Sequence, residues 1–266
     1  MTKESQEWAL ILGASSGFGA ATAVELARSG MNVFGVHLDL RSTLPNAQRV
    51  VAEVESLGRR AVFFNTNAAD ADKRAAVLSS IQETLRSRPD AYVRVFMHSL
   101  AFGTLVPYIA EGPKQRVSQR QMEMTLDVMA NSLVYWVQDL MALKLMRRGS
   151  RVFAMTSSGS TRVIQNYGPV SAAKAALESH VRQLAVELGP SGIAVNSIRA
   201  GITDTPAMRK IAGALALYER SAAQNPSGRA TTVEDVAKAI AALCDERLYW
   251  MTGNVIGVDG GEEITA

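Results

Sequence analysis

A tyrosine and a lysine, Tyr167 and Lys174, stand seven residues apart at the start of a helical pattern. A phenol with an ordinary pKa near 10 is a hydrogen-bond donor at neutral pH, and a nearby ammonium group favours its ionised form. Because Pro169 disfavours a helix that starts before it, Tyr167 is predicted to lie on the loop that enters the helix. Alone it would be interpreted as a packing residue. Together with Lys174 and the glycine-rich turn described next, it predicts a reactive centre.

A glycine-rich turn near the start of the chain reads Gly13-Ala14-Ser15-Ser16-Gly17-Phe18-Gly19. Its glycines allow a tight turn and a close backbone approach to a phosphate. The helix that follows offers free N–H groups and a partial positive charge to the same anion. A glycine-rich turn is weak evidence by itself, but this one follows the first predicted strand and opens a helix. The turn, from Gly13 through Gly19, therefore predicts a pyrophosphate site.

Polar residues also follow the second and third predicted strands. The second strand ends at His37, with Asp39 and Arg41 just beyond it. An acidic residue here binds the ribose hydroxyls of NAD, whereas a basic residue accommodates the 2′-phosphate of NADP. His37 and Arg41 favour the phosphate and Asp39 opposes it, which gives a slight preference for NADP(H) over NAD(H). Asn67-Ala68 follows the third strand, where a side chain could reach the adenine.

Alternating patterns predict the elements that must position these residues. Seven apolar, strand-like runs alternate with helix-period segments, so the strands must pair in parallel with right-handed crossovers. We expect a Rossmann-like, doubly wound α/β fold: one domain over residues 1–266, with a seven-stranded parallel sheet covered by helices on both faces. The strands are predicted at 9–12, 32–37, 60–64, 93–98, 151–156, 194–198 and 255–258, and the helices at 19–29, 45–57, 72–87, 120–147, 172–188 and 232–243.

Composition narrows the functional classes. The chain has 266 residues, 20% of them charged, and a formal net charge of +3 without a basic run, so a nucleic-acid partner is not expected. Cys244 is the single cysteine and is predicted to be an inert, buried thiol. The three histidines lack zinc-like spacing, so no metal site is predicted. No apolar run is long enough to span a membrane, and the N-terminus lacks a signal-peptide pattern, so a cytoplasmic location is expected.

Taken in order, these features resemble the short-chain dehydrogenase/reductase superfamily over nearly the whole chain. The resemblance rests on the Gly13/Gly17/Gly19 spacing, on Asn196-Ser197-Ile198-Arg199-Ala200-Gly201 and on Val258-Asp259-Gly260-Gly261. The superfamily usually has a tyrosine four residues before the lysine, but Val170 stands there and has no proton to give. The longer Tyr167-to-Lys174 spacing resembles the enoyl-acyl-carrier-protein reductase branch. So do Met97-His98-Ser99-Leu100-Ala101, Asn166-Tyr167 and Ala200-Gly201.

The chain also departs from the common enoyl reductase. That enzyme has a second tyrosine ten residues before the catalytic one, where this chain has Ser157. Ser157 stands seventeen residues before Lys174, where ordinary superfamily members keep their serine. With its short glycine-rich turn, the chain is most similar to the NADPH-preferring third type of bacterial enoyl reductase. That type usually has an arginine in the turn, where this chain has Ser16, so the resemblance transfers its cofactor preference poorly.

The resemblance implies NAD(P)H-dependent reduction of the carbon–carbon double bond of an enoyl thioester in fatty-acid synthesis. Tyr167 would donate a hydrogen bond to the thioester oxygen, Lys174 would bind the nicotinamide ribose, and Ser157 would complete the catalytic set. A segment at about 203–226 would cover the substrate. Further cofactor contacts would come from Ser99, Leu100, Ala101, Gly201, Ile202, Thr203 and Thr205, and the acyl pocket would be lined by Phe102, Leu105, Tyr108 and Met208.

Several alternatives stay open on the sequence alone. An ordinary member of the superfamily would act on a carbonyl or alcohol, such as a 3-oxoacyl thioester or a small ketone, through Ser157 and a repositioned Tyr167. A dienoyl-thioester reductase and a non-catalytic nucleotide sensor are further possibilities. An acyl carrier protein is a candidate partner for the basic residues Lys114, Arg116, Arg120, Arg209 and Lys210. The resemblance also suggests a homotetramer, with the predicted helices 120–147 and 172–188 as interfaces.

Overall fold

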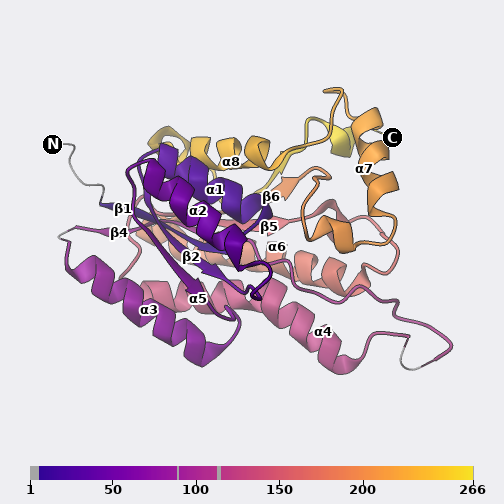
Figure 1. Cartoon of the computed structure of the whole chain (residues 1–266), viewed down its shortest axis with the longest axis horizontal. Helices are drawn as coiled ribbons and strands as arrows, with labels where there is room; N and C mark the ends of the chain where they lie inside the picture. The colour runs from indigo at the N-terminus through magenta and orange to yellow at the C-terminus, as the bar shows by residue number, and fades with distance from the viewer. Residues whose placement is uncertain (1–5, 89, 113–114, 266) are drawn as a thin grey trace.

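A seven-stranded parallel sheet runs through the molecule (Figure 1). The computed structural model describes residues 6–88, 90–112 and 115–265. The strands pair in the order β3-β2-β1-β4-β5-β6-β7, and all six pairings are parallel. This confirms the predicted sheet. The strands are β1 (Glu7–Leu12), β2 (Asn32–His37), β3 (Ala61–Asn65), β4 (Tyr92–His98), β5 (Arg151–Thr156), β6 (Ala194–Ala200) and β7 (Val255–Val258).

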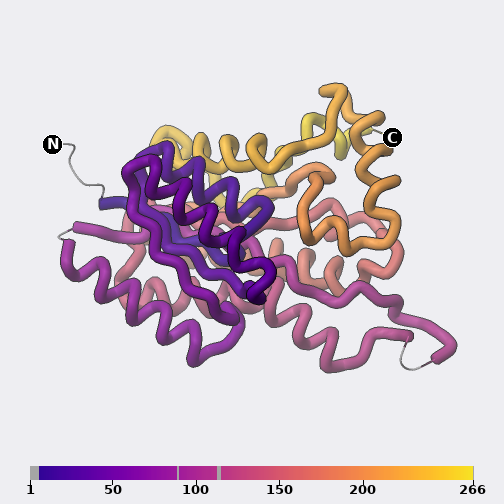
Figure 2. The backbone as a smooth tube through the Cα atoms, in the orientation of Figure 1, coloured from indigo at the N-terminus to yellow at the C-terminus, as the bar shows by residue number. Residues whose placement is uncertain are grey.

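Helices cover both faces of the sheet, as predicted (Figure 1). One face carries α1 (Gly17–Arg28), α2 (Leu44–Ser56) and α8 (Val233–Ala242), and the other carries α3 (Ala71–Arg86), α5 (Ser132–Ala142) and α6 (Gly168–Leu188). Two more helices, α4 (Gln119–Leu126) and α7 (Ala214–Gln224), lie towards one end of the molecule (Figure 2). Within the described residues, no helix is long and apolar enough to cross a membrane.

Alternation along β1 explains why the sheet needs two helical layers. Trp8, Leu10 and Leu12 point into the core beneath α3, α5 and α6, whereas Ala9 and Ile11 point into the core beneath α1 and α8. All five side chains are fully buried. Successive side chains of a strand point to opposite faces, so a strand that is apolar throughout must be covered on both.

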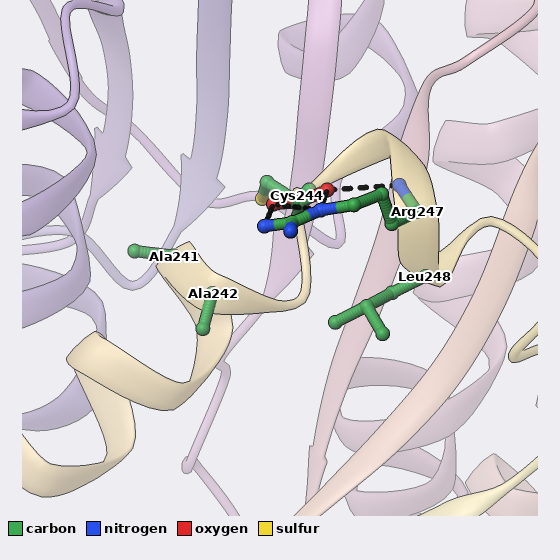
Figure 3. A pocket seen from close by; sticks show the side chains of 6 residues that line it. Ala241, Ala242, Cys244, Arg247 and Leu248 are labelled. Carbon is green, nitrogen blue, oxygen red and sulfur yellow. Dashed lines mark hydrogen bonds and ion pairs between the residues drawn. The ribbon is translucent and has the colours of Figure 1, made fainter.

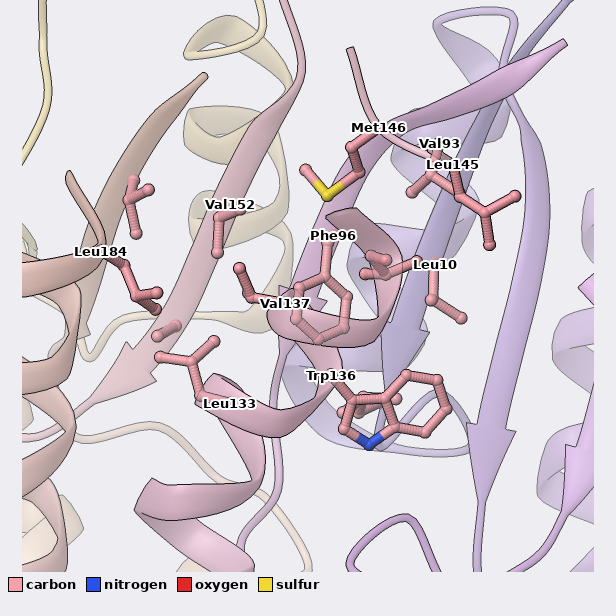
Figure 4. Close-up of a cluster of buried hydrophobic side chains, with 14 of the residues drawn as sticks. Leu10, Val93, Phe96, Leu133, Trp136, Val137, Leu145, Met146, Val152 and Leu184 are labelled. Carbon is pink, nitrogen blue, oxygen red and sulfur yellow. The ribbon is translucent and has the colours of Figure 1, made fainter. Parts of the chain in front are cut away.

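The core beneath α5 is built around Trp136 (Figure 4). Its ring lies 6.2 Å from that of Phe96 on β4, and Leu133 and Val137 lie on the same helix. The indole Nε1 donates a hydrogen bond of 2.8 Å to the carbonyl oxygen of Ala68. Trp136 therefore connects α5 both to the centre of the sheet and to the segment that follows β3.

The predicted helix 120–147 is wrong in its length. The structure divides it into α4, a π-helical turn η1 (Asp127–Asn131) and α5, which ends at Ala142. Lys144 adopts a left-handed conformation (φ +55°), and Leu145 N–H donates to Leu140 C=O at 2.9 Å. This turn reverses the chain so that Leu145 enters the core. Neither glycine nor proline marks this helix end, which is why the sequence did not reveal it.

The strand order reverses between β1 and β4, which are adjacent in the sheet: β2 and β3 are added on one side of β1, and β4 to β7 on the other. In doubly wound folds the ligand crevice lies beyond the carboxyl ends of strands at such a switch point. The glycine-rich turn follows β1, and Ser99 follows β4. The long segment before α4, the segments after β5 and β6, and α7 lie at this same end of the molecule (Figure 2).

Trp136→Phe tests the contribution of the core beneath α5. The substitution removes ring volume and leaves the buried Ala68 carbonyl without its donor, so the free energy of unfolding should fall by about 2–3 kcal/mol. Urea denaturation followed by circular dichroism measures this change. Trp250→Phe is the control, since Trp250 is 83% exposed, and should shift stability by less than about 0.5 kcal/mol. Equal effects of the two variants would contradict the analysis.

Candidate functional site

The glycine-rich turn is tightly packed at the switch point. Gly13 (φ +84°) lies so close to the carbonyl oxygen of Ser99 that a Cβ atom would overlap it, and a Cβ on Gly19 would overlap the carbonyl oxygen of Gly13. Ser16 is the N-cap of α1, but its side chain makes no capping hydrogen bond. The first amides of α1 therefore keep their capacity to bind an anion. This cradle fits the pyrophosphate of a dinucleotide.

The end of β2 carries an acidic group held in place by its neighbours. The carboxylate of Asp39 lies 2.8 Å from Nδ1 of His37, and the backbone of Asp39 makes two hydrogen bonds with the side chain of Asn65. Burial acts to raise the pKa of Asp39, but hydrogen bonds from Thr43, Ser15 and His37 outweigh it and hold the pKa below its ordinary value. Ser15 links this carboxylate to the glycine-rich turn.

This geometry changes the interpretation of the predicted cofactor residues at β2. His37 is buried and directs its ring at Asp39, so its imidazole is already engaged. Arg41 is exposed and is the remaining basic candidate for a 2′-phosphate. At the end of β3, Asn67 accepts a local hydrogen bond from Ala69 N–H. The carbonyl of Ala68 is occupied by Trp136.

Lys174 is buried at the carboxyl end of β5. Its Nζ donates a hydrogen bond of 2.7 Å to the carbonyl oxygen of Met155, and the residue is 5% exposed. Burial lowers the pKa of Lys174 to about 8, and Glu178 on the same helix opposes that shift. Glu178 itself accepts a hydrogen bond from Thr156 at 2.5 Å. Because an ammonium group has three donors, Lys174 retains capacity for ligand hydroxyls.

Tyr167 is the N-cap residue of α6, as the position of Pro169 predicts. Burial raises the pKa of Tyr167, and a hydrogen bond with Ser157 acts in the opposite direction. Its ring packs against Gly159, where a Cβ atom would lie 2.6 Å away. The structure thus brings together Ser157 and Tyr167 beside the start of the lysine helix. Val170 instead lies in an apolar cluster with Met129.

A buried histidine lies near the lysine. Nε2 of His98, at the end of β4, is 2.8 Å from Ser132 Oγ, which donates to the carbonyl oxygen of Val128. Burial and the charge of Lys174 lower the pKa of His98 to about 3, so the imidazole is neutral. Oδ1 of Asn131, the last residue of η1, lies 3.2 Å from Nε2 of His180 on α6. The sequence did not single out Ser132, which is the first residue of α5 and is fully buried.

The segment after β6 returns to the glycine-rich turn. Thr205 is buried, and its side chain lies 3.5 Å from the position of a Cβ on Gly17. The hydroxyl of Thr203 bonds the carbonyl of Gly201, and the amide of Ile202 donates to Glu262 at 3.0 Å. The sequence predicted the segment but missed Glu262, because residues 60 positions apart carry no shared signal.

Of the four predicted pocket residues, Leu105 and Tyr108 lie beside Tyr167 and the start of α6. Leu105 packs against the same apolar cluster as Tyr167, and the ring of Tyr108 covers Gly168. Met208 begins the short helix η4 (Met208–Lys210), where its amide donates to Thr205. Phe102 is 57% exposed, and no contact among the described residues brings it to Tyr167. Ser99 contacts Gly13, Leu100 packs on the core beneath α5, and Ala101 is exposed.

A separate depression lies between the end of α8 and the short helix η5 (Glu246–Leu248) (Figure 3). It borders Cys244, whose carbonyl accepts from Arg94 near the start of β4. The depression therefore lies at the amino ends of the strands, opposite the site. Cys244 is buried, as predicted, and burial raises the pKa of its thiol to about 12. Among the described residues, no cluster could hold a metal ion.

Lys174→Met tests the buried ammonium through the pH dependence of stability. Below about pH 8, Lys174 is protonated in both the native and unfolded states; between about 8 and 10.5, only the unfolded chain holds that proton. Because the unfolded state then binds more protons, stability rises with pH in this window. Relative to Lys174→Met, the wild type should gain up to about 3 kcal/mol.

Urea unfolding at pH 7, 8, 9 and 10 measures this difference. Lys238→Met is the matched control because Lys238 is exposed on α8, and its difference from wild type should not vary with pH. A constant difference between wild type and Lys174→Met would show that Lys174 is well solvated.

Comparison with known proteins places this geometry in a family. Residues 13–263 match the family described as "Enoyl-(Acyl carrier protein) reductase". The chain is 31% identical over 267 residues to 1-cyclohexenylcarbonyl-CoA reductase of Streptomyces collinus, covering 100% of this chain and 90% of that protein. It is also 31% identical over 170 residues to the NADH enoyl-[acyl-carrier-protein] reductase FabI of Aquifex aeolicus, covering 64% of this chain and 62% of that enzyme.

Solved structures agree with the sequence relatives. A short-chain dehydrogenase from Burkholderia cenocepacia in complex with NADP superimposes with a TM-score of 0.80 at 25% identity, covering 98% of this chain and 100% of that chain. The fold, the glycine-rich cradle and the match over residues 13–263 lead to one conclusion. The chain belongs to the enoyl-(acyl-carrier-protein) reductase family of the short-chain dehydrogenase/reductase superfamily, and it is an NAD(P)-dependent oxidoreductase.

Proposed function

We propose that this protein reduces the carbon–carbon double bond of an enoyl thioester. The observation that carries the proposal is the place of Tyr167 at the N-cap of α6, two helical turns before the buried Lys174. A tyrosine one turn before Lys174 is ruled out, because Val170 occupies that position within an apolar cluster. The phenol thus approaches the site from the loop, as the resemblance to enoyl reductases implies.

The mechanism assigns distinct tasks to the residues of the site. The glycine-rich turn and the N-terminus of α1 would hold the pyrophosphate, and Lys174 would bind the ribose hydroxyls. The bound nicotinamide would supply a hydride to the β-carbon of the thioester. Tyr167 would donate a hydrogen bond to the thioester oxygen, where negative charge develops. Since burial raises the pKa of Tyr167, the phenol stays protonated at neutral pH and remains a donor.

Carbonyl reduction is the second candidate function. It is favoured by the hydrogen bond between Ser157 and Tyr167, because a serine beside the tyrosine is the arrangement of ordinary superfamily members. The promiscuous reductase LugOII, which catalyses keto-reduction at C1 during lugdunomycin biosynthesis, has a TM-score of 0.81 to this chain at 25% identity. Parallel assays with crotonyl-CoA and acetoacetyl-CoA, followed at the nicotinamide absorbance band, separate the two functions. Turnover of the keto substrate alone would reject enoyl reduction.

Tyr167→Phe tests the proposed donor. Loss of one oxyanion donor should lower kcat with crotonyl-CoA by about 10²–10³-fold, while the dissociation constant of NADH changes little. Steady-state kinetics and fluorescence titration of the cofactor measure the two quantities. Tyr249→Phe is the control, since Tyr249 is 60% exposed and follows η5, near the amino ends of the strands. Undiminished turnover by Tyr167→Phe would reject the assignment.

The cofactor proposed for this reaction is NADH, which reverses the slight preference for NADPH drawn from the sequence. The carboxylate of Asp39 is fixed beside Ser15 and is kept ionised by its hydrogen bonds. A carboxylate at the end of β2 accepts hydrogen bonds from ribose hydroxyls and repels a 2′-phosphate. His37, on which the NADPH preference partly rested, is bonded to that same carboxylate.

Asp39→Asn should shift the cofactor preference towards NADPH. Removing the charge while keeping the side-chain shape should raise the ratio of kcat/KM for NADPH to that for NADH by tenfold or more, equivalent to about 1.4 kcal/mol. Kinetics with each cofactor at fixed crotonyl-CoA concentration provide the ratio. Arg41→Ala serves as the comparison. A wild type that prefers NADPH, and loses that preference in Arg41→Ala, would contradict the proposal.

The carrier of the acyl group and the homotetramer stay predictions. Of the five basic residues predicted to meet an acidic carrier, Lys114 lies outside the described residues, and Arg209 is paired with Asp204 at 2.6 Å. On the predicted interface helices, Val186 is 74% exposed and Tyr135 lies under the guanidinium of Arg74.

A further inference from the structure

The turn that follows β7 contacts three segments of the site. We define it as residues 259–264 and call it the post-β7 turn. Its central residue, Glu262, accepts two hydrogen bonds on one carboxylate oxygen, from the amide of Ile202 at 3.0 Å and from the hydroxyl of Ser221 at 2.7 Å. Ile202 belongs to the segment after β6, and Ser221 belongs to α7. One oxygen atom therefore joins the proposed nicotinamide segment to the proposed substrate cover.

The contact with Ser221 attaches the body of α7 to the post-β7 turn. A second contact lies at the end of the helix, where the C-cap residue Asn225 donates to the carbonyl oxygen of Asp259 at 2.7 Å. Among its eleven residues, Ser221 alone is buried, and Leu215 is 70% exposed. A helix that buries so little apolar surface gains little stability from packing. The hydrogen bond to Glu262 thus holds the one residue that is buried within α7 itself.

Glu262 also contacts the segment that follows β6. The Glu262 carboxylate packs directly on Gly201, where a Cβ atom would lie 2.7 Å from the same oxygen. The neighbouring residue, Glu263, contacts Arg162: Nη2 of Arg162 donates to the backbone carbonyl oxygen of Glu263 at 2.7 Å. Arg162 lies on the loop between Ser157 and Tyr167, so the post-β7 turn also touches the loop that carries the phenol.

We propose that Glu262 is a positioning residue that couples cofactor binding to closure of α7 over the substrate. The assignment of the two segments rests on the proposed function. Because both donors share one acceptor oxygen, a shift of Ile202 on cofactor binding would change the hydrogen bond of Ser221. Cofactor binding would then secure α7 before the thioester enters.

Limited proteolysis of the full-length protein tests this coupling without any thioester. Trypsin can cut α7 at Arg220, which is exposed, and NADH should slow that cleavage in the wild type. Glu262→Ala should lose this protection and bind NADH about tenfold more weakly, since a hydrogen bond to a charged group is removed. Ser221→Ala should lose the protection but keep its NADH affinity within about twofold. Glu262→Gln retains an acceptor oxygen, so it should keep most of the protection from trypsin and most of the NADH affinity.

Glu263→Ala is the matched control, because it changes the same turn without touching Ile202 or Ser221. It should keep both the protection and the NADH affinity. Undiminished protection in Glu262→Ala and Ser221→Ala would overturn the proposal. If Glu262→Ala fails to fold, as judged by thermal denaturation, Ser221→Ala decides alone: lost protection supports the coupling and retained protection overturns it. Absence of enoyl reduction would reject the proposed function and leave these measurements intact.

Discussion

The buried ammonium group of Lys174 sets the main constraint on the site. Its hydrogen bond to the carbonyl oxygen of Met155 fixes α6 against the end of β5, and this contact determines where Tyr167 stands at the head of the same helix. Desolvation lowers the pKa of Lys174 to about 8, so its charge is costly without further acceptors. Ribose hydroxyls would supply such acceptors. The buried position of Lys174 thus agrees with the cofactor role proposed for it.

The fold could be predicted from the sequence because its main signals are local. Seven apolar runs alternate with helical periods, and a parallel sheet follows from that alternation alone; β2, β5 and β7 match their predicted bounds. The prediction of a single helix over 120–147 was wrong because tertiary contacts determine where that helix is interrupted and where it ends. Ser132 bonds both His98 and the carbonyl of Val128 within the π-helical turn, and Lys144 reverses the chain without a glycine. Periodicity does not encode either contact.

The site was predicted unevenly for a similar reason. The glycine-rich turn and the pair Tyr167 and Lys174 depend on short spacing, which a sequence displays directly. The roles of His37 and Asp39 depend on side-chain direction, and the sequence could not show that the imidazole is engaged by the carboxylate. Glu262 was missed altogether, because its importance arises from a contact with Ile202 across sixty residues.

The tyrosine lies on the loop before α6 and not within the helix. Its orientation must therefore be fixed by contacts other than those of the helix. A tyrosine within α6 would be oriented by the helix, but Tyr167 follows Asn166, whose backbone is left-handed at φ +61°. Its direction depends on Ser157, on the close packing of Gly159 and on the path of the loop. Arg162 ties that loop to the post-β7 turn. The orientation of the Tyr167 phenol therefore depends on several distant segments, and substitutions far from it in the sequence can disturb it.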